Sequence, residues 1–193
     1  MRRTRTAGVA LLALAVAGSA AACADDDAGA ATLARLQASA SASPSLSDEE
    51  QEKQRVVEEA EEFLAEFQQA EVDAGNDGFT GWPTLANEYW SSALAEGFVP
   101  VYQEAAAKGQ YTTGASELES SEVTDYVAEE PGHEQVAFTS CLDTSSLHLH
   151  QKDGSEIPLP NERERSVVVH RLVHQGEGNS WRVTESTPQD GSC

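Results

Sequence analysis

Four histidines fall in two pairs that could share a metal ion. His148 and His150 are two residues apart in the alternating segment SSLHLHQK, so their side chains share one face of an expected strand. His170 lies in RERSVVVHRLV and His174 directly follows this segment, so these two residues, four apart, share a face of the next expected strand. If those strands paired in register, the imidazoles could hold zinc. No cysteine or carboxylate completes a recognised zinc spacing, so a solvated polar sheet face is the simpler interpretation, and we expect no metal site.

Carboxylates are abundant, but none stands in a catalytic motif. Asp125 and Asp143 are the candidates for a general base, because each lies beside Ser, Thr or Cys in an expected strand or turn. Acids in such places are ordinarily surface residues. We therefore expect neither catalysis nor a cofactor. An enzyme that buries a carboxylate or a histidine pair is the alternative.

The N-terminal residues have the form of an export signal. Arg2, Arg3 and Arg5 are followed by an uncharged run, 7–22, which is shorter than the ~20 apolar residues of a membrane span. The sequence Ala21-Ala22-Cys23 resembles the lipobox of bacterial lipoproteins, in which the thiol is diacylated and becomes the new N-terminus. The resemblance implies a lipid anchor at Cys23, on the extracytoplasmic face of the cell membrane. Position 20 is Ala where that family has Leu, Val or Ile, so ordinary secretion after an A-x-A site is the alternative.

Acylation of Cys23 would leave two cysteines, Cys141 and Cys193. An oxidising compartment makes a disulfide between them the expected state. The alternative is a buried free Cys141 and an unpaired thiol at position 193.

Charge excludes nucleic acid as a partner. The chain has 12 Lys and Arg against 33 Asp and Glu, and loss of the three N-terminal arginines leaves 9 against 33, a net charge of −24. Such a chain repels phosphate backbones. The remaining partners are the membrane, through the anchor, and an unknown envelope protein or small ligand.

Three segments follow from the composition. Residues 1–22 are the lipoprotein signal peptide, and residues 23–47 are the lipidated cysteine with a disordered tether of Ala, Ser and Asp. Residues 48–193 form one domain.

Within the domain, helices precede strands, which predicts an α+β fold. Ser47 and Glu50 form a capping box, and the helix that follows has an apolar stripe and ends at GNDG, 75–78. The stripe contains Val56, Ala60, Phe63, Phe67 and Ala70, widened by Val57 and Leu64. Two further helices are expected, from about Pro83 to Gly97 and from about Val99 to Gly109. Alternating residues then predict antiparallel strands in SEVTDYVAE, EQVAFTSCLD, SSLHLHQK, RERSVVVHRLV and SWRVTEST.

Residues 48–193 resemble small exported lipoproteins of the nuclear transport factor 2-like superfamily. The resemblance depends on EQVAFTSCLD, a DGS turn, a strand with Arg165 and Val167–Val169, and GNSWRV before the last cysteine. It implies a strongly curved antiparallel sheet that wraps the first helix as a cone, with a pocket inside. Because the superfamily includes isomerases, dehydratases, transport adaptors and accessory domains, the fold alone implies no single function. We expect a membrane-anchored lipoprotein with a non-catalytic ligand- or partner-binding domain. The alternative is an isomerase- or cyclase-like enzyme that uses the pocket.

Overall fold

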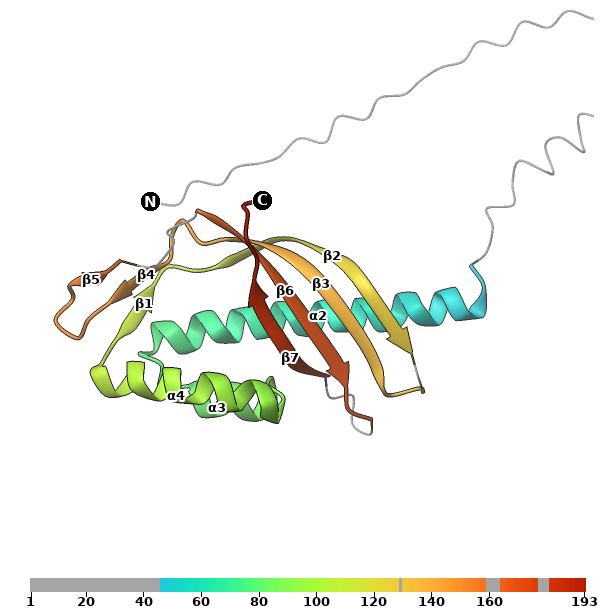
Figure 1. Cartoon of the computed structure of the whole chain (residues 1–193), viewed down its shortest axis with the longest axis horizontal. Helices are drawn as coiled ribbons and strands as arrows, with labels where there is room; N and C mark the ends of the chain where they lie inside the picture. Colours follow the sequence, from blue (N-terminus) through green and yellow to red (C-terminus); the bar gives the residue numbers. More distant parts are fainter. Residues whose placement is uncertain (1–45, 129, 159–163, 177–180) are drawn as a thin grey trace, which may run out of the picture. The chain divides into compact units, whose positions relative to one another are not determined.

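In the part of the chain that the structure describes, three helices precede two antiparallel sheets, which makes the fold α+β (Figure 1). A computed structural model describes residues 46–128, 130–158, 164–176 and 181–193. The predicted signal peptide, Cys23 and residues 24–45 of the predicted tether lie outside the described residues. Residues 46–193 form one compact unit. The helices are α2 (Asp48–Asn76), α3 (Trp82–Glu88) and α4 (Ser92–Lys108); the strands are β1 (Tyr111–Thr113), β2 (Glu117–Ala128), β3 (Glu134–Asp143), β4 (His148–His150), β5 (Glu156–Ile157), β6 (Arg165–His174) and β7 (Trp181–Pro188).

Helix α2 begins and ends where the sequence predicts. The Glu50 amide donates to Ser47 Oγ at 3.3 Å, and the Ser47 amide donates to Glu50 Oε2 at 2.8 Å, which completes the capping box. The predicted stripe is largely buried, as the fully enclosed Ala60, Leu64 and Phe67 show. Gln68 is buried beside them, although the sequence analysis did not include it in the stripe.

The predicted boundary between the second and third helices is wrong. The break lies at residues 89–91, because the Ser91 hydroxyl accepts a hydrogen bond from the Leu94 amide at 3.2 Å and so caps α4. Gly97, which we expected to end a helix, lies inside α4. The end at Gly109 is confirmed, since this residue adopts a left-handed conformation with φ 68°.

The strands form two separate sheets. The larger has the order β2-β3-β6-β7 and the smaller has the order β1-β4-β5, with every neighbouring pair antiparallel. Neither β1 nor β5 is predicted from the sequence, because three and two residues are too few to show an alternating pattern. The strand containing His148 and His150 lies in the smaller sheet, and the strand containing His170 and His174 lies in the larger sheet. The two strands do not pair, although the zinc hypothesis required that they should.

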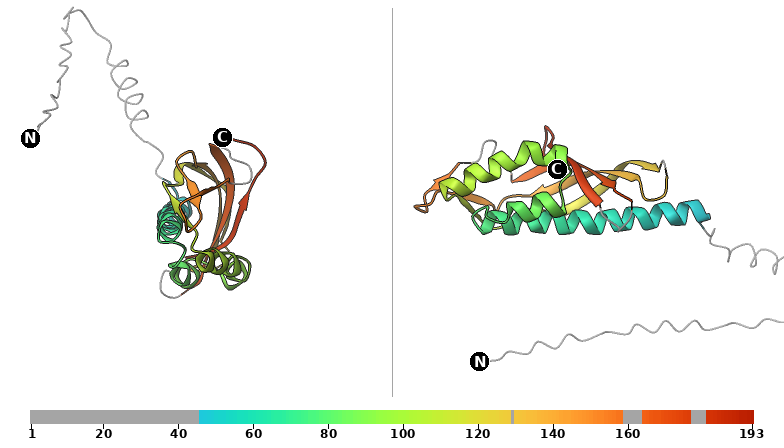
Figure 2. Two further views of the ribbon diagram at one scale, coloured as in Figure 1. Left: turned by 90° about the vertical axis from the view of Figure 1, so that its left-hand side faces the viewer. Right: turned by 90° about the horizontal axis from the view of Figure 1, so that it is seen from below.

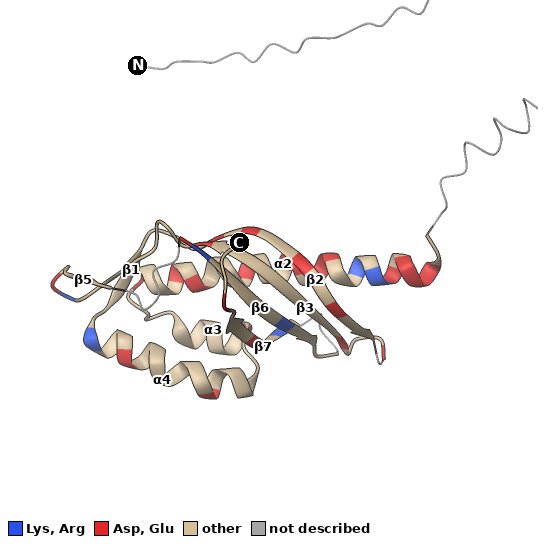
Figure 3. Ribbon diagram, turned by 45° about the horizontal axis from the view of Figure 1, so that its top comes forward, with Lys and Arg blue, Asp and Glu red and all other residues tan. Residues whose placement is uncertain are grey.

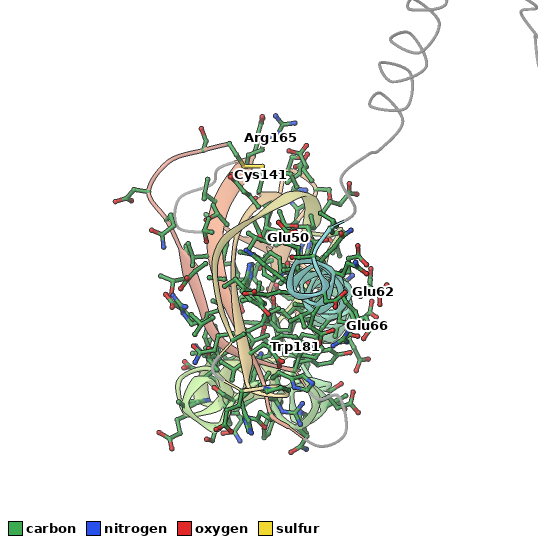
Figure 4. All side chains as sticks on the ribbon, turned by 90° about the vertical axis from the view of Figure 1, so that its right-hand side faces the viewer. Glu50, Glu62, Glu66, Cys141, Arg165 and Trp181 are labelled. Atoms are coloured by element: carbon green, nitrogen blue, oxygen red, sulfur yellow. A yellow bond between two sulfur atoms is a disulfide. The ribbon has the colours of Figure 1, made fainter. Side chains whose placement is uncertain are left out.

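The core lies between α2 and one face of the larger sheet, with α3 and α4 at one end (Figures 1 and 2). Inward side chains of the sheet include Phe138, Leu172 and Trp181, all at most 3% exposed. The opposite side of α2 is acidic (Figure 3), and Glu62 and Glu66 project away from the sheet (Figure 4). Burial of apolar side chains in this layer is the main stabilising contribution to the fold.

Candidate functional site

A cavity of about 250 Å³ lies beside the second half of α2. Its wall is formed by α2, the turn after α2, α4, β1, the residue before β2, the end of β3 and the turn before β4. The lining residues are Gln68, Glu71, Val72, Gly75, Phe79, Tyr102, Thr112, Ser116, Leu142 and Leu147. The lining is thus mixed, with apolar side chains around a small number of polar groups, as is usual for small-molecule sites.

Glu71 is the acidic residue of this cavity. Burial of its carboxyl raises the pKa from an ordinary 4.5 to about 8, and a hydrogen bond with Tyr102 offsets only part of this effect. Burial, with the nearby Glu71 carboxyl, also raises the pKa of the Tyr102 hydroxyl. Glu71 is therefore mostly a neutral acid at pH 7, able to donate or accept a hydrogen bond.

Gln68 connects the cavity to a row of buried, hydrogen-bonded side chains that continues to His170 and Ser140. The Gln68 Nε2 lies 3.1 Å from His170 Nε2, and His170 Nδ1 lies 3.2 Å from Ser140 Oγ. All three residues are buried, at 6%, 0% and 1% exposed respectively. Burial lowers the pKa of His170 from 6.5 to about 4, so the ring is neutral at pH 7.

Phe79 is held in an unusual backbone conformation at the cavity wall. Its φ is 60°, in the left-handed region that bulky residues rarely adopt. The Phe79 amide donates to the Ala74 carbonyl at 2.7 Å. Its ring packs edge-on against Tyr102, with centroids 5.4 Å apart and an interplanar angle of 88°. Backbone strain of this kind occurs most often at functional sites.

The close approach of β1 to α2 depends on Gly75. A Cβ atom at this position would lie 2.5 Å from Thr112 Oγ1. Thr112 donates to Asn76 Oδ1 at 3.0 Å, which ties the same strand to the end of the helix. The small sheet is therefore positioned as one wall of the cavity.

The two histidine pairs do not converge. His148 lies 2.8 Å from Glu156, and His150 lies 2.9 Å from the Thr113 hydroxyl, all in the small sheet. The second pair lies in the larger sheet, where His170 is in the core. His174 Nδ1 is 3.6 Å from Glu134 Oε2. Within the described residues, no group of three or more His, Cys, Asp or Glu side chains is arranged to hold a metal ion.

The two carboxylates considered as general bases lie outside the cavity. Asp125 is exposed on β2 and forms an ion pair with Arg171 at 3.2 Å. Asp143 accepts hydrogen bonds from Ser145, and these bonds lower the pKa of its carboxyl. Neither therefore has the desolvated environment of a catalytic base. Glu71 does, and the sequence analysis missed it.

A signal for Glu71 and Gln68 was present in the sequence. Leu64, Gln68, Glu71 and Gly75 are spaced by four, three and four residues, so they continue one face of the helix. Leu64 belongs to the predicted stripe, and polar residues on the same face would be expected near the core. A polar group on a buried face needs a partner or a ligand, and this makes it a candidate for function.

Cys141 and Cys193 lie at disulfide distance, with the sulfur atoms 1.99 Å apart (Figure 4). This agrees with the predicted pairing. The bond joins β3 to the residues that follow β7. Neither cysteine is among the residues that line the cavity, although Cys141 directly precedes the lining residue Leu142.

Comparison with known proteins gives no family for this chain. No protein-family profile matches it, and no curated protein shows significant sequence similarity to it. None of the helices in the described part of the chain has the length and apolarity needed to cross a membrane.

Proposed function

We propose that this chain is a membrane-anchored extracytoplasmic lipoprotein whose domain, residues 48–193, binds a small and largely apolar molecule without transforming it. The anchor follows from the export signal and the lipobox-like Ala21-Ala22-Cys23. The binding function depends on the cavity beside α2.

The proposed binding function depends on one observation. The neutral Glu71 and its hydrogen-bond partner Tyr102 line a cavity whose other walls are largely apolar. An apolar cavity of about 150 Å³ suffices to bind benzene. The cavity of about 250 Å³ therefore has room for one ring with a short substituent. The apolar walls would supply affinity, and the polar pair would fix the orientation of the ligand.

The nuclear transport factor 2-like fold is part of the proposal. A helix along one face of an antiparallel sheet supports it (Figure 2). The cavity, which is lined by residues of this helix and of both sheets, also supports it. Both sheets are open in the described residues, and the helices precede the strands. A cone in the strict sense remains a proposal.

Binding can be tested with the Cys23→Ser chain and a panel of benzene derivatives with one polar substituent. We expect saturable binding in ligand-observed NMR and a rise in the melting temperature. Val72→Phe should fill the cavity and abolish binding. Val101→Phe, at a surface position with 60% exposure, is the matched control and should bind like the parent chain. If no member of the panel binds, or if both variants bind equally well, the cavity is not the binding site.

A second candidate function is an isomerase-like enzyme, and the raised pKa of Glu71 favours it. A carboxylate with a pKa of about 8 is a strong enough base to remove a proton next to a carbonyl group, and Tyr102 could donate to the developing oxyanion. The test is conversion of cyclohex-3-enone to its conjugated isomer, followed by ultraviolet absorbance. The rate should increase as pH rises towards 8 and be lost in Glu71→Gln. Binding without turnover would favour the non-catalytic function.

A further inference from the structure

We propose that the ligand of the cavity is an organic cation, a small amine whose ammonium group pairs with the Glu71 carboxylate while its apolar body lies against Phe79 and Tyr102. This inference rests on the proposed binding function and specifies its ligand class.

The cavity lining lacks a positive charge, because no Lys, Arg or His is among the described residues that form it. Tyr102, on the facing helix α4, is the titratable group that interacts with the Glu71 carboxyl. Without a cation, Glu71 keeps its proton. When an ammonium group enters, the acid can release that proton to solvent and form an ion pair in a site of low polarity.

The cavity lining offers several hydrogen-bond acceptors. Because Gln68 Nε2 faces His170, the Gln68 amide oxygen is left to accept from a ligand. The Glu71 carboxylate and the hydroxyl oxygens of Tyr102, Thr112 and Ser116 can also accept. An alkylammonium group has three N–H donors and no acceptor, so this set of groups can satisfy all three donors.

Two aromatic rings form part of the cavity wall. Phe79 and Tyr102 both line the cavity, and their rings pack perpendicular to each other with centroids 5.4 Å apart. Cations are attracted to aromatic faces within about 6 Å of the ring centroid. The left-handed backbone of Phe79 holds its ring at this wall.

The electrostatic field of the whole chain also favours a cationic ligand. The net charge of −21 raises the local concentration of cations and repels anions. The acidic surface of α2 is visible in Figure 3. An anionic ligand would meet this repulsion and would also find no positive group in the described lining.

The experiment compares benzylamine, benzyl alcohol and benzoate, which share one ring and differ in charge. Calorimetry of the Cys23→Ser chain at pH 7, in two buffers with different heats of ionisation, measures affinity and proton release together. We expect benzylamine to bind at least tenfold more tightly than benzyl alcohol, with release of close to one proton. Benzoate should not bind.

Glu71→Gln should weaken benzylamine binding at least tenfold and remove the proton release, and it should weaken benzyl alcohol binding by a smaller factor. Glu66→Gln, which removes an exposed carboxylate from the same helix, is the matched control and should change neither. Thermal unfolding verifies that both variants are folded. If benzyl alcohol binds as well as benzylamine, the cation proposal is wrong and the binding function stands. If none of the three compounds binds and the wider panel also fails, the binding function itself is wrong.

Discussion

Gln68 on α2 and His170 on β6 meet through their Nε2 atoms at 3.1 Å, across 102 residues of sequence. Because an amide nitrogen can only donate, His170 Nε2 accepts, and the ring proton therefore lies on Nδ1 and points to Ser140. The contact fixes the His170 tautomer and the orientation of the Gln68 amide. It thereby sets which atom of Gln68 the cavity presents.

The burial of His170 predicts a loss of stability in acid. Its pKa is 6.5 when unfolded and about 4 when folded, so the unfolded state takes up the proton first as pH falls. The free energy of unfolding should decrease by about 1.4 kcal/mol per pH unit within that window. Urea denaturation between pH 4 and 7 measures the slope. The measurement is made in the Glu71→Gln variant, because Glu71 titrates over the same pH range and changes the stability in the opposite direction.

His170→Leu should lack this slope. It should also lower stability at pH 7 by about 2–4 kcal/mol, because it leaves the polar groups of Gln68 and Ser140 without their partner. His133→Leu, at an exposed turn position, is the control. An unchanged acid slope in His170→Leu would contradict the assignment.

Glu71 predicts the opposite dependence on pH. Its folded pKa of about 8 lies above the ordinary 4.5, so the folded state holds a proton that the unfolded chain has already lost. Stability should therefore fall as pH rises from about 4.5 to about 8, by about 1.4 kcal/mol per unit. Glu71→Gln keeps the shape of the side chain and cannot ionise. The variant should therefore be more stable than the parent chain at pH 8.5, and its free energy of unfolding should change less with pH. Equal stability of the two chains at pH 8.5 would show that Glu71 ionises freely.

The pairing of Cys141 with Cys193 predicts a measurable contribution to stability. The bond closes a loop over a sequence separation of 52 residues, for which chain entropy gives about 4 kcal/mol. Cys193→Ser should lower the denaturation midpoint accordingly, and reduction of the parent chain should have the same effect. Peptide mapping of exported protein without reductant should recover the two cysteines linked. Free thiols at both positions would refute the pairing.

Local signals predicted α2 well and the site poorly. Ser47, Glu50 and GNDG define the helix ends because capping and glycine conformation are local effects. Glu71 was not predicted because its burial depends on Tyr102 and β1, which approach from elsewhere in the chain. The same limit applies to the histidines. Strand patterns show which residues share a face, whereas the pairing of β4 with β1 joins residues that are far apart in the sequence.

Cys23→Ser tests the anchor. Two acyl chains hold a protein stably at a membrane, whereas one gives marginal binding, since each buried methylene contributes ~0.8 kcal/mol. The substitution should leave the fold of the domain unchanged and move the protein from the membrane fraction to the medium, or leave an unprocessed precursor. Mass spectrometry of the wild-type N-terminus provides the direct measurement. An unmodified N-terminus at Cys23 or later would show ordinary secretion.

Helix α4 supplies Tyr102 to the cavity, yet no residue of this helix is fully buried. Elements with little buried surface open more readily than the core, so amide protons of α4 should exchange with solvent faster than those of β3, where seven of ten residues are buried. The cavity thus has one wall that opens on a shorter timescale than the rest of the domain. If a bound molecule leaves through this wall, substitutions that speed amide exchange in α4 should also shorten its residence time.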